Sequence, residues 1–284
     1  HIQYWNHPWL TYYQPLEPIF TSKNIYLNGG SYLYNYSIEK NEIIRNYYSG
    51  QEYLSGNENG PHQKRFITTH SANQLFMFTN KVNSSQKTVK CFDLNLNLQW
   101  DLSDQKIAAT DEPICTPLES QGKLFCLGYD KRDTIKVISL SVYDSLNGER
   151  ISRTPISYMP APCFDEVGSR RISNWNTYTH DEHFTQDNGF VYGFTGAGVL
   201  FKADANSGYI TWAKGFAKTS INNREVIWDA INFAASGYIK IYGDLVISFM
   251  PDIQMLTAVN KNTGEIEWQT AFYKPQFFHD RGKS

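Results

Sequence analysis

Hydrophobic and polar residues alternate along this chain in short runs, and Asn, Asp, Gly and Ser interrupt the runs at regular distances. Such alternation predicts β-strands, and the interruptions predict tight turns between antiparallel neighbours. The clearest example runs from Leu256 to Trp268, where an apolar strand is followed by Asn260, Gly264 and the closing Trp. The segment from Leu200 to Trp212 repeats the same spacing, which indicates a recurring β-hairpin.

Five copies of this hairpin can be traced along the chain. The Asp-equivalent position recurs at intervals of 51 to 60 residues, at Ser37, Asp93, Asp144, Asp204 and Asn260. The side chain there can bond the turn's own N–H groups, Gly can take a positive φ, and the Trp can cover the hairpin. Two more apolar runs precede each hairpin, so each unit reads as a four-stranded antiparallel meander, which is the blade of a β-propeller.

The best-preserved units resemble the PQQ-like, or quinoprotein-like, propeller repeat. Its signature is an apolar strand, Ala-x-Asp, a turn, Thr-Gly-x-Ile and Trp, which Ala258-Val259-Asn260, Thr263-Gly264 and Trp268 follow closely. The unit ending at Trp212 matches nearly as well, and the other three match in part. The resemblance implies the architecture and leaves the activity open, because the same blade serves dehydrogenases, assembly scaffolds and sensor domains.

We therefore expect a single all-β propeller domain over residues 1–284, with five blades; a six- or seven-bladed ring with degenerate blades is the alternative. The expected blades span residues 18–48, 64–102, 112–153, 182–214 and 235–273. The aromatic segments 1–17 and 274–284 are expected to close the ring.

The connections between blades indicate which end of the propeller binds a partner. The turns between the third and fourth strands are short and regular, whereas the connections from one blade to the next are long and uneven, which is typical of functional loops. Two of these connections combine aromatic and charged residues, as protein–protein hot spots do. The predicted partner-binding residues are Arg170, Arg171, Trp175, Tyr178, His180, Asp181, Trp228 and Asp229. The alternative is that Trp175 and Trp228 pack back onto the propeller.

Composition narrows the function classes. The chain has 26 Lys+Arg against 28 Asp+Glu, a balance that disfavours a purely electrostatic binder of nucleic acid or of a membrane surface. No apolar run approaches the roughly 20 residues of a membrane-spanning helix. No signal-peptide pattern is present, but the chain starts at His1, so the compartment stays open between cytoplasmic and periplasmic or extracellular.

Metal and redox chemistry are not expected. His180 and His183 would face opposite sides of a strand, and the chain has neither Cys-Cys nor Cys-x-x-Cys-His, so we expect no metal, quinone or haem cofactor. Cys115 and Cys126 become direct cross-strand neighbours, within disulfide range, if the turn is centred between Ser120 and Gln121. They are otherwise two buried thiols.

The function we expect is non-enzymatic: a propeller that binds another protein through its long-loop end. An assembly scaffold and a toxin-neutralising immunity protein both fit, and the residues do not separate them. The rival class acts on carbohydrate, either as a lectin-like binder or as a glycoside hydrolase with two carboxylates flanking the bond.

Overall fold

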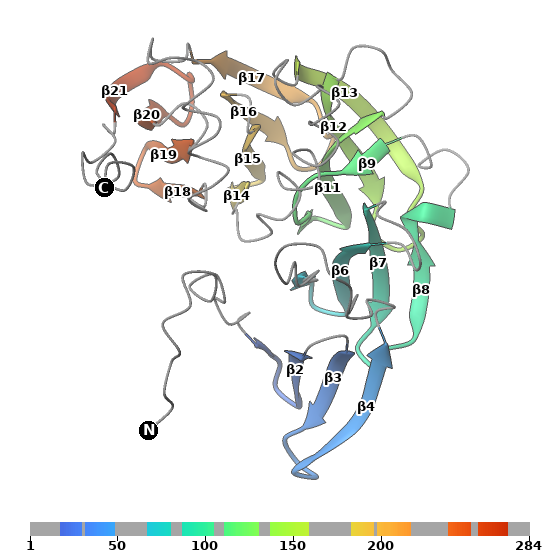
Figure 1. Cartoon of the computed structure of the whole chain (residues 1–284). Helices are drawn as coiled ribbons and strands as arrows, with labels where there is room; N and C mark the ends of the chain where they lie inside the picture. Colours follow the sequence, from blue (N-terminus) through green and yellow to red (C-terminus); the bar gives the residue numbers. More distant parts are fainter. Residues whose placement is uncertain are drawn as a thin grey trace, which may run out of the picture. The chain divides into compact units, whose positions relative to one another are not determined.

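The computed structural model describes ten stretches of the chain, and they consist almost entirely of β-strands (Figure 1). The described residues are 18–29, 32–48, 67–80, 87–104, 111–130, 137–158, 183–195, 198–216, 238–250 and 255–271. Within these stretches the only helix is the short 3₁₀ turn η1 (Leu102–Asp104). No helix in the described part of the chain has the length and apolarity needed to cross a bilayer.

The strands form five antiparallel sheets, which we call blades 1 to 5 in chain order. Blade 1 contains β1 (Ile19–Phe20), β2 (Asn24–Gly29), β3 (Tyr32–Ser37) and β4 (Glu42–Tyr48), and blade 2 contains β5 (Ile67–His70), β6 (Gln74–Asn80), β7 (Lys87–Asp93) and β8 (Leu98–Asp101). Blade 3 contains β10 (Leu118–Ser120), β11 (Lys123–Asp130), β12 (Val137–Asp144) and β13 (Arg150–Tyr158), with β9 (Asp111–Pro113) also paired to β11.

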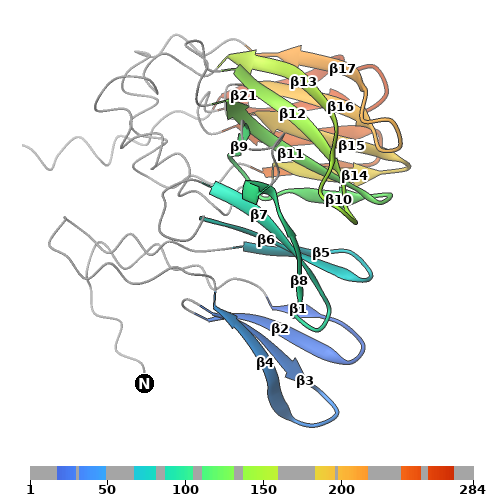
Figure 2. The same cartoon turned by 90° about the vertical axis from the view of Figure 1, so that its right-hand side faces the viewer.

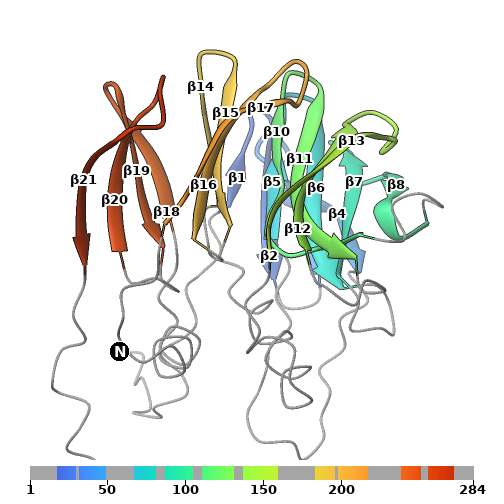
Figure 3. The same cartoon turned by 90° about the horizontal axis from the view of Figure 1, so that it is seen from above.

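Blades 4 and 5 repeat the same order of neighbouring strands. Blade 4 contains β14 (Phe184–Asp187), β15 (Phe190–Thr195), β16 (Val199–Asp204) and β17 (Ile210–Gly215), and blade 5 contains β18 (Tyr238–Tyr242), β19 (Leu245–Met250), β20 (Met255–Asn260) and β21 (Ile266–Ala271). Apart from β9, each strand of a blade pairs with its neighbour in sequence, as the tight β14–β15 hairpin in Figure 3 illustrates. The prediction of an all-β chain built from four-stranded antiparallel blades is confirmed.

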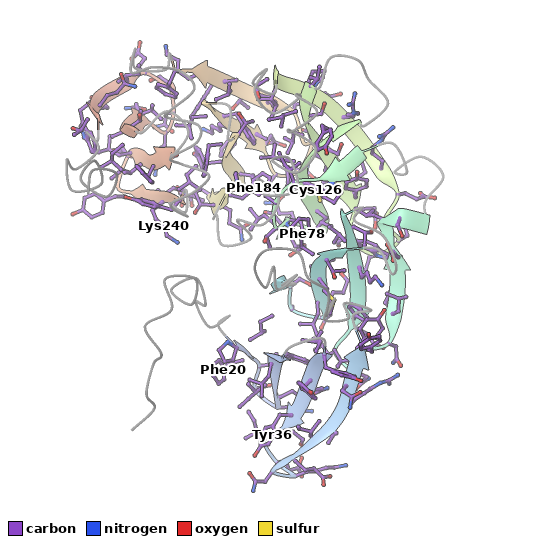
Figure 4. All side chains as sticks on the ribbon, viewed as in Figure 1. Phe20, Tyr36, Phe78, Cys126, Phe184 and Lys240 are labelled. Atoms are coloured by element: carbon purple, nitrogen blue, oxygen red, sulfur yellow. The ribbon has the colours of Figure 1, made fainter. Side chains whose placement is uncertain are left out.

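By contact density the chain divides into two compact units. The first comprises residues 1–181 with the turn 205–208, and the second comprises residues 182–204 and 209–284. In the first unit, shown edge-on in Figure 2, one apolar cluster joins blades 1 and 2 and another joins blades 2 and 3. Phe78 and Cys126, both labelled in Figure 4, belong to the cluster between blades 2 and 3. In the second unit, a cluster that includes Phe194, Ile239 and Val246 joins blades 4 and 5.

The pattern of buried residues along a strand shows whether one or both faces of its sheet are covered. In β12 every residue from Ile138 to Tyr143 is buried, because blade 3 is covered on both faces there. In β3 burial alternates, with Leu33, Asn35 and Ser37 buried and the intervening tyrosines not. One face of blade 1 is therefore packed and the other is not.

The structure corrects the centre of the turn predicted between Cys115 and Cys126. Ser120 pairs with Lys123, so the turn is centred on Gln121 and Gly122, one residue later than expected. The first strand of blade 3 is also split into β9 and β10, and Cys115 lies in the break between them. Before that break, β9 pairs with β11 in the predicted register, with Pro113 opposite Gly128, and the Ile114 N–H donates to the Leu127 carbonyl at 2.9 Å. Cys115 follows Ile114 directly and lies near Cys126, and both side chains are buried thiols. Burial, followed by the nearby Cys115, raises the pKa of Cys126 well above its ordinary value.

Candidate functional site

The hairpin ends of the blades are capped by hydrogen bonds from within each turn. In the β7–β8 turn, Asp93 Oδ1 accepts from the N–H groups of Asn95 (2.9 Å) and Asn97 (2.8 Å). Asp144 and Asn260 cap the corresponding turns of blades 3 and 5 in the same way. The repeated Asp or Asn of the sequence is thus a turn cap, and this end of each blade has a structural role.

Tryptophans lock neighbouring blades together at these hairpins. Trp100 of blade 2 stacks on Gly148 of blade 3 and donates from Nε1 to the Ser145 carbonyl at 3.1 Å. Trp212 of blade 4 does the same on Gly264 of blade 5, donating to the Lys261 carbonyl at 3.3 Å. A Cβ at either glycine would lie 2.8–2.9 Å from the indole ring, so only glycine fits beneath the Trp.

The opposite end of the blades carries the uneven connections. Consecutive blades are joined there by segments such as the one between β4 and β5, residues 49–66, and the one between β13 and β14, residues 159–183. The predicted partner-binding residues belong to these connections and lie outside the described residues: Arg170, Arg171, Trp175, Tyr178, His180, Asp181, Trp228 and Asp229. Their role stays a prediction.

One buried charged cluster stands at the start of such a connection. The Lys90 ammonium lies 3.6 Å from Asp101 Oδ2, and the two side chains are 5% and 9% exposed. Asp101 Oδ1 also accepts from Thr88 Oγ1 at 2.5 Å and from the Ser103 N–H at 2.8 Å. Tyr47 of blade 1 accepts from Lys90 at 3.3 Å. The cluster fixes the direction in which the chain leaves β8, because Ser103 belongs to η1.

A second charged cluster joins the hairpins of blades 4 and 5. Lys261 Nζ lies 3.1 Å from Asp187 Oδ2 and donates to the Gly243 carbonyl at 2.9 Å. Beside it, Lys202 Nζ lies 3.8 Å from the centre of the Phe190 ring, a cation–π contact. Burial lowers the pKa of Lys202, the charge of Lys261 lowers it further, and Asp187 opposes both. The ion pair between Lys261 of blade 5 and Asp187 of blade 4 therefore holds the two blades together.

His183 has a structural environment. Its ring stacks on Phe194 at 4.5 Å between centroids, and Nδ1 lies 3.0 Å from the Phe194 carbonyl oxygen. Within the described stretches, no three His, Cys, Asp or Glu side chains come together as metal ligands.

Sequence reasoning did not single out Lys90, Asp101, Lys202 or Lys261. A usable signal existed for two of them, because Lys90 stands between Val89 and Cys91 and Lys202 stands between Phe201 and Ala203, each a charge between two apolar residues of a strand. The partners Asp101 and Asp187 carried no comparable signal, since each becomes a neighbour only when strands or blades pack.

No protein-family model matches the chain, and no curated protein sequence matches it. Solved structures do match. A europium-containing methanol dehydrogenase superposes with a TM-score of 0.55 at 12% identity, over 90% of this chain and 50% of its own. The quinohemoprotein alcohol dehydrogenase ADHIIG from Pseudomonas putida HK5 gives 0.53 at 11% identity, over 92% of this chain and 42% of its own.

A computationally designed protein, Ika8, matches with a TM-score of 0.51 at 10% identity, over 89% of this chain and 60% of its own. The chain thus spans between 42% and 60% of the length of these three matched chains. At identities this low the likenesses concern the fold alone, and that fold is a β-propeller.

Proposed function

We propose that this chain is a non-enzymatic, protein-binding propeller of the PQQ-like repeat family, and that its partner binds at the end where consecutive blades are connected. The observation that carries the proposal is the contrast between the two ends. At one end every described hairpin is tight and repeats its neighbours, whereas at the other end the connections differ from blade to blade. A repeated scaffold with unlike loops at one end presents a single asymmetric surface, as recognition of one particular protein requires.

The charges of the described blades support a binding role over a catalytic one. The buried carboxylate Asp101 is held by Lys90, Thr88 and Ser103, and Asp187 is held by Lys261. Carboxylates bonded in this way orient loops and blades and are poorly placed to transfer protons to a substrate. The sequence also lacks the adjacent cysteine pair expected of a quinone-dependent dehydrogenase.

The near-zero net charge suggests how the partner is recognised. With 26 basic and 28 acidic residues, the chain has little global field to steer a partner, so local patches must set the register. Arg170, Arg171, Asp181 and Asp229 are proposed for that role, with Trp175, Tyr178 and Trp228 as aromatic anchors. His180, which lies in sequence between the aromatic Tyr178 and the charged Asp181, completes the proposed set. An assembly scaffold and an immunity protein remain the two forms of the proposal.

The test is affinity capture from the source organism, followed by binding measurements on the purified partner. Trp175→Ala and Arg171→Glu should each weaken binding by at least tenfold, which corresponds to about 1.4 kcal/mol. Tyr209→Ala and Leu146→Ala are matched controls, because these side chains are 73% and 74% exposed on hairpins at the other end, and they should leave affinity unchanged. If only the controls lose binding, the binding end is misassigned; binding or hydrolysis of glycans in place of a protein would favour the carbohydrate-active class.

A further inference from the structure

The two faces of blade 1 are covered very differently. On the face toward blade 2, Tyr26 is 1% exposed and both Leu33 and Asn35 are 0% exposed. The opposite face, which we call the aromatic face, presents Phe20, Tyr32, Tyr34, Tyr36, Ile43 and Tyr48, none of which is buried. Phe20 and Tyr36 are labelled on this blade in Figure 4.

Strand pairing makes the aromatic face continuous. Phe20 pairs with Ile25, Ile25 pairs with Tyr36, and Tyr36 pairs with Ile43, so one apolar row crosses all four strands. Beside this row the Tyr32 ring contacts Tyr34 at 5.9 Å and Tyr48 at 5.2 Å between centroids. Phe20 is 65%, Ile43 is 54% and Tyr48 is 42% exposed. Contiguous apolar surface of this kind is typical of a face that something covers.

Equivalent positions in the other blades of the same unit are covered. Phe92 of blade 2 and Tyr143 of blade 3 occupy the strand position of Tyr36, because they pair with Leu75 and Leu124 as Tyr36 pairs with Ile25. Phe92 is 0% and Tyr143 is 2% exposed, each against the preceding blade. The aromatic face is therefore built as a packing surface, and within the described residues of this unit no blade precedes it.

We propose that residues 1–17 of the same chain cover the aromatic face of blade 1. This segment runs directly into β1, whose second residue, Phe20, is the most exposed member of the face. Its composition matches an uncharged aromatic surface: it contains Tyr4, Trp5, Trp9, Tyr12 and Tyr13, and its only Lys, Arg, Asp or Glu is Glu17.

The entry point of the segment supports this assignment. Within the described residues β1 is an edge strand of two residues, in which Ile19 pairs with Tyr26 and Phe20 pairs with Ile25. Seventeen residues can span roughly 55 Å when extended, whereas a six-residue strand is roughly 20 Å long, so the segment can reach every part of the face.

The test uses the full-length protein and the fluorescence of Trp5 and Trp9. The spectrum of the unchanged chain minus that of the Trp5→Phe/Trp9→Phe variant isolates these two indoles. If the segment covers the face, their acrylamide quenching constant is several-fold lower in the protein than in a synthetic peptide of residues 1–17. Ile43→Asp and Tyr48→Asp, each checked for folding by far-UV circular dichroism, should restore the peptide value, whereas Leu146→Asp, on a distant hairpin of the same unit, should not.

Two results would overturn the proposal. One is a quenching constant in the unchanged protein equal to that of the peptide. The other is a constant that stays low in both Ile43→Asp and Tyr48→Asp, because the indoles would then be covered elsewhere. Sedimentation velocity identifies the competing occupant: if the unchanged protein is a dimer and Ile43→Asp is a monomer with unaltered quenching, the aromatic face holds a second copy of the chain.

Discussion

Replacing Gly148 by Ala tests how much the contact between Trp100 and its hairpin contributes to stability. Gly148 has φ +73°, and an added Cβ would lie 2.9 Å from Trp100 Cδ2 and 3.0 Å from Cε3. Gly122, in the same blade, has φ +75° with nothing within 4 Å of an added Cβ. The two substitutions therefore share the backbone strain and differ in the clash with the indole.

The expected magnitudes follow from these two geometries. A left-handed backbone costs an Ala about 1–2 kcal/mol, offset by about 0.4–1 kcal/mol from the reduced entropy of the unfolded chain. Gly122→Ala should thus lower the free energy of unfolding by about 1 kcal/mol. Forcing a methyl group against a packed ring adds about 1–3 kcal/mol. Gly148→Ala should therefore lower the free energy of unfolding by about 2–4 kcal/mol.

Urea unfolding followed by far-UV circular dichroism measures both variants in one transition, because the two glycines belong to the same compact unit. In a Trp100→Ala background, Gly148→Ala should cost no more than Gly122→Ala does. The reasoning is refuted if Gly148→Ala and Gly122→Ala are equally destabilising in the presence of Trp100, or if removing Trp100 leaves the difference intact.

Three further predictions concern buried charges, a turn cap and the thiols. Lys90→Met should lower the free energy of unfolding by about 3–5 kcal/mol by leaving the buried Asp101 uncompensated, whereas Lys90→Met/Asp101→Leu should recover most of that loss in urea titrations. Burial alone would raise the pKa of Asp93, but the hydrogen bonds from Asn97 and Asn95 outweigh it and lower the pKa below 3.8. Ionised Asp93 therefore stabilises the fold above that pH, and the excess stability over Asp93→Asn should vanish as the pH falls through the lowered pKa in pH-dependent thermal unfolding. Burial, then the charge of Asp93, raises the pKa of Cys91 to about 12. Alkylation at pH 8, read by mass spectrometry, should therefore modify the buried Cys91, Cys115 and Cys126 only after denaturant is added, and modification of any of these three in the native protein would contradict their burial.

Strands and hairpins could be predicted from the sequence because they depend on residues that lie close together along the chain. Asp93, Asp144 and Asn260 each cap a single turn. In the regular copies a Gly follows four residues later in the same turn, so this spacing is enough to predict the hairpins. The turn at Ser120–Gly122 is centred one residue later than predicted, because its composition permits two centres and only packing selects between them.

Side-chain contacts between neighbouring strands could not be predicted from the local sequence. Nothing near Lys90 in the sequence indicates that Asp101 will neutralise it, and nothing near Lys202 indicates that the Phe190 ring will lie against its ammonium. These pairs are brought together by the pairing and stacking of strands, and their energies depend on the water excluded when they meet.

The sequence by itself determined the repeat, the strand order within each blade and the two kinds of blade end, because these depend on periodicity and turn chemistry over a few residues. Only the tertiary structure decided which face of each blade is covered. Tyr36, Phe92 and Tyr143 stand at the same position of the repeat, yet the last two are buried and Tyr36 is not. Burial of an apolar side chain depends on what packs against it, and a local pattern that recurs in each blade cannot specify that neighbour.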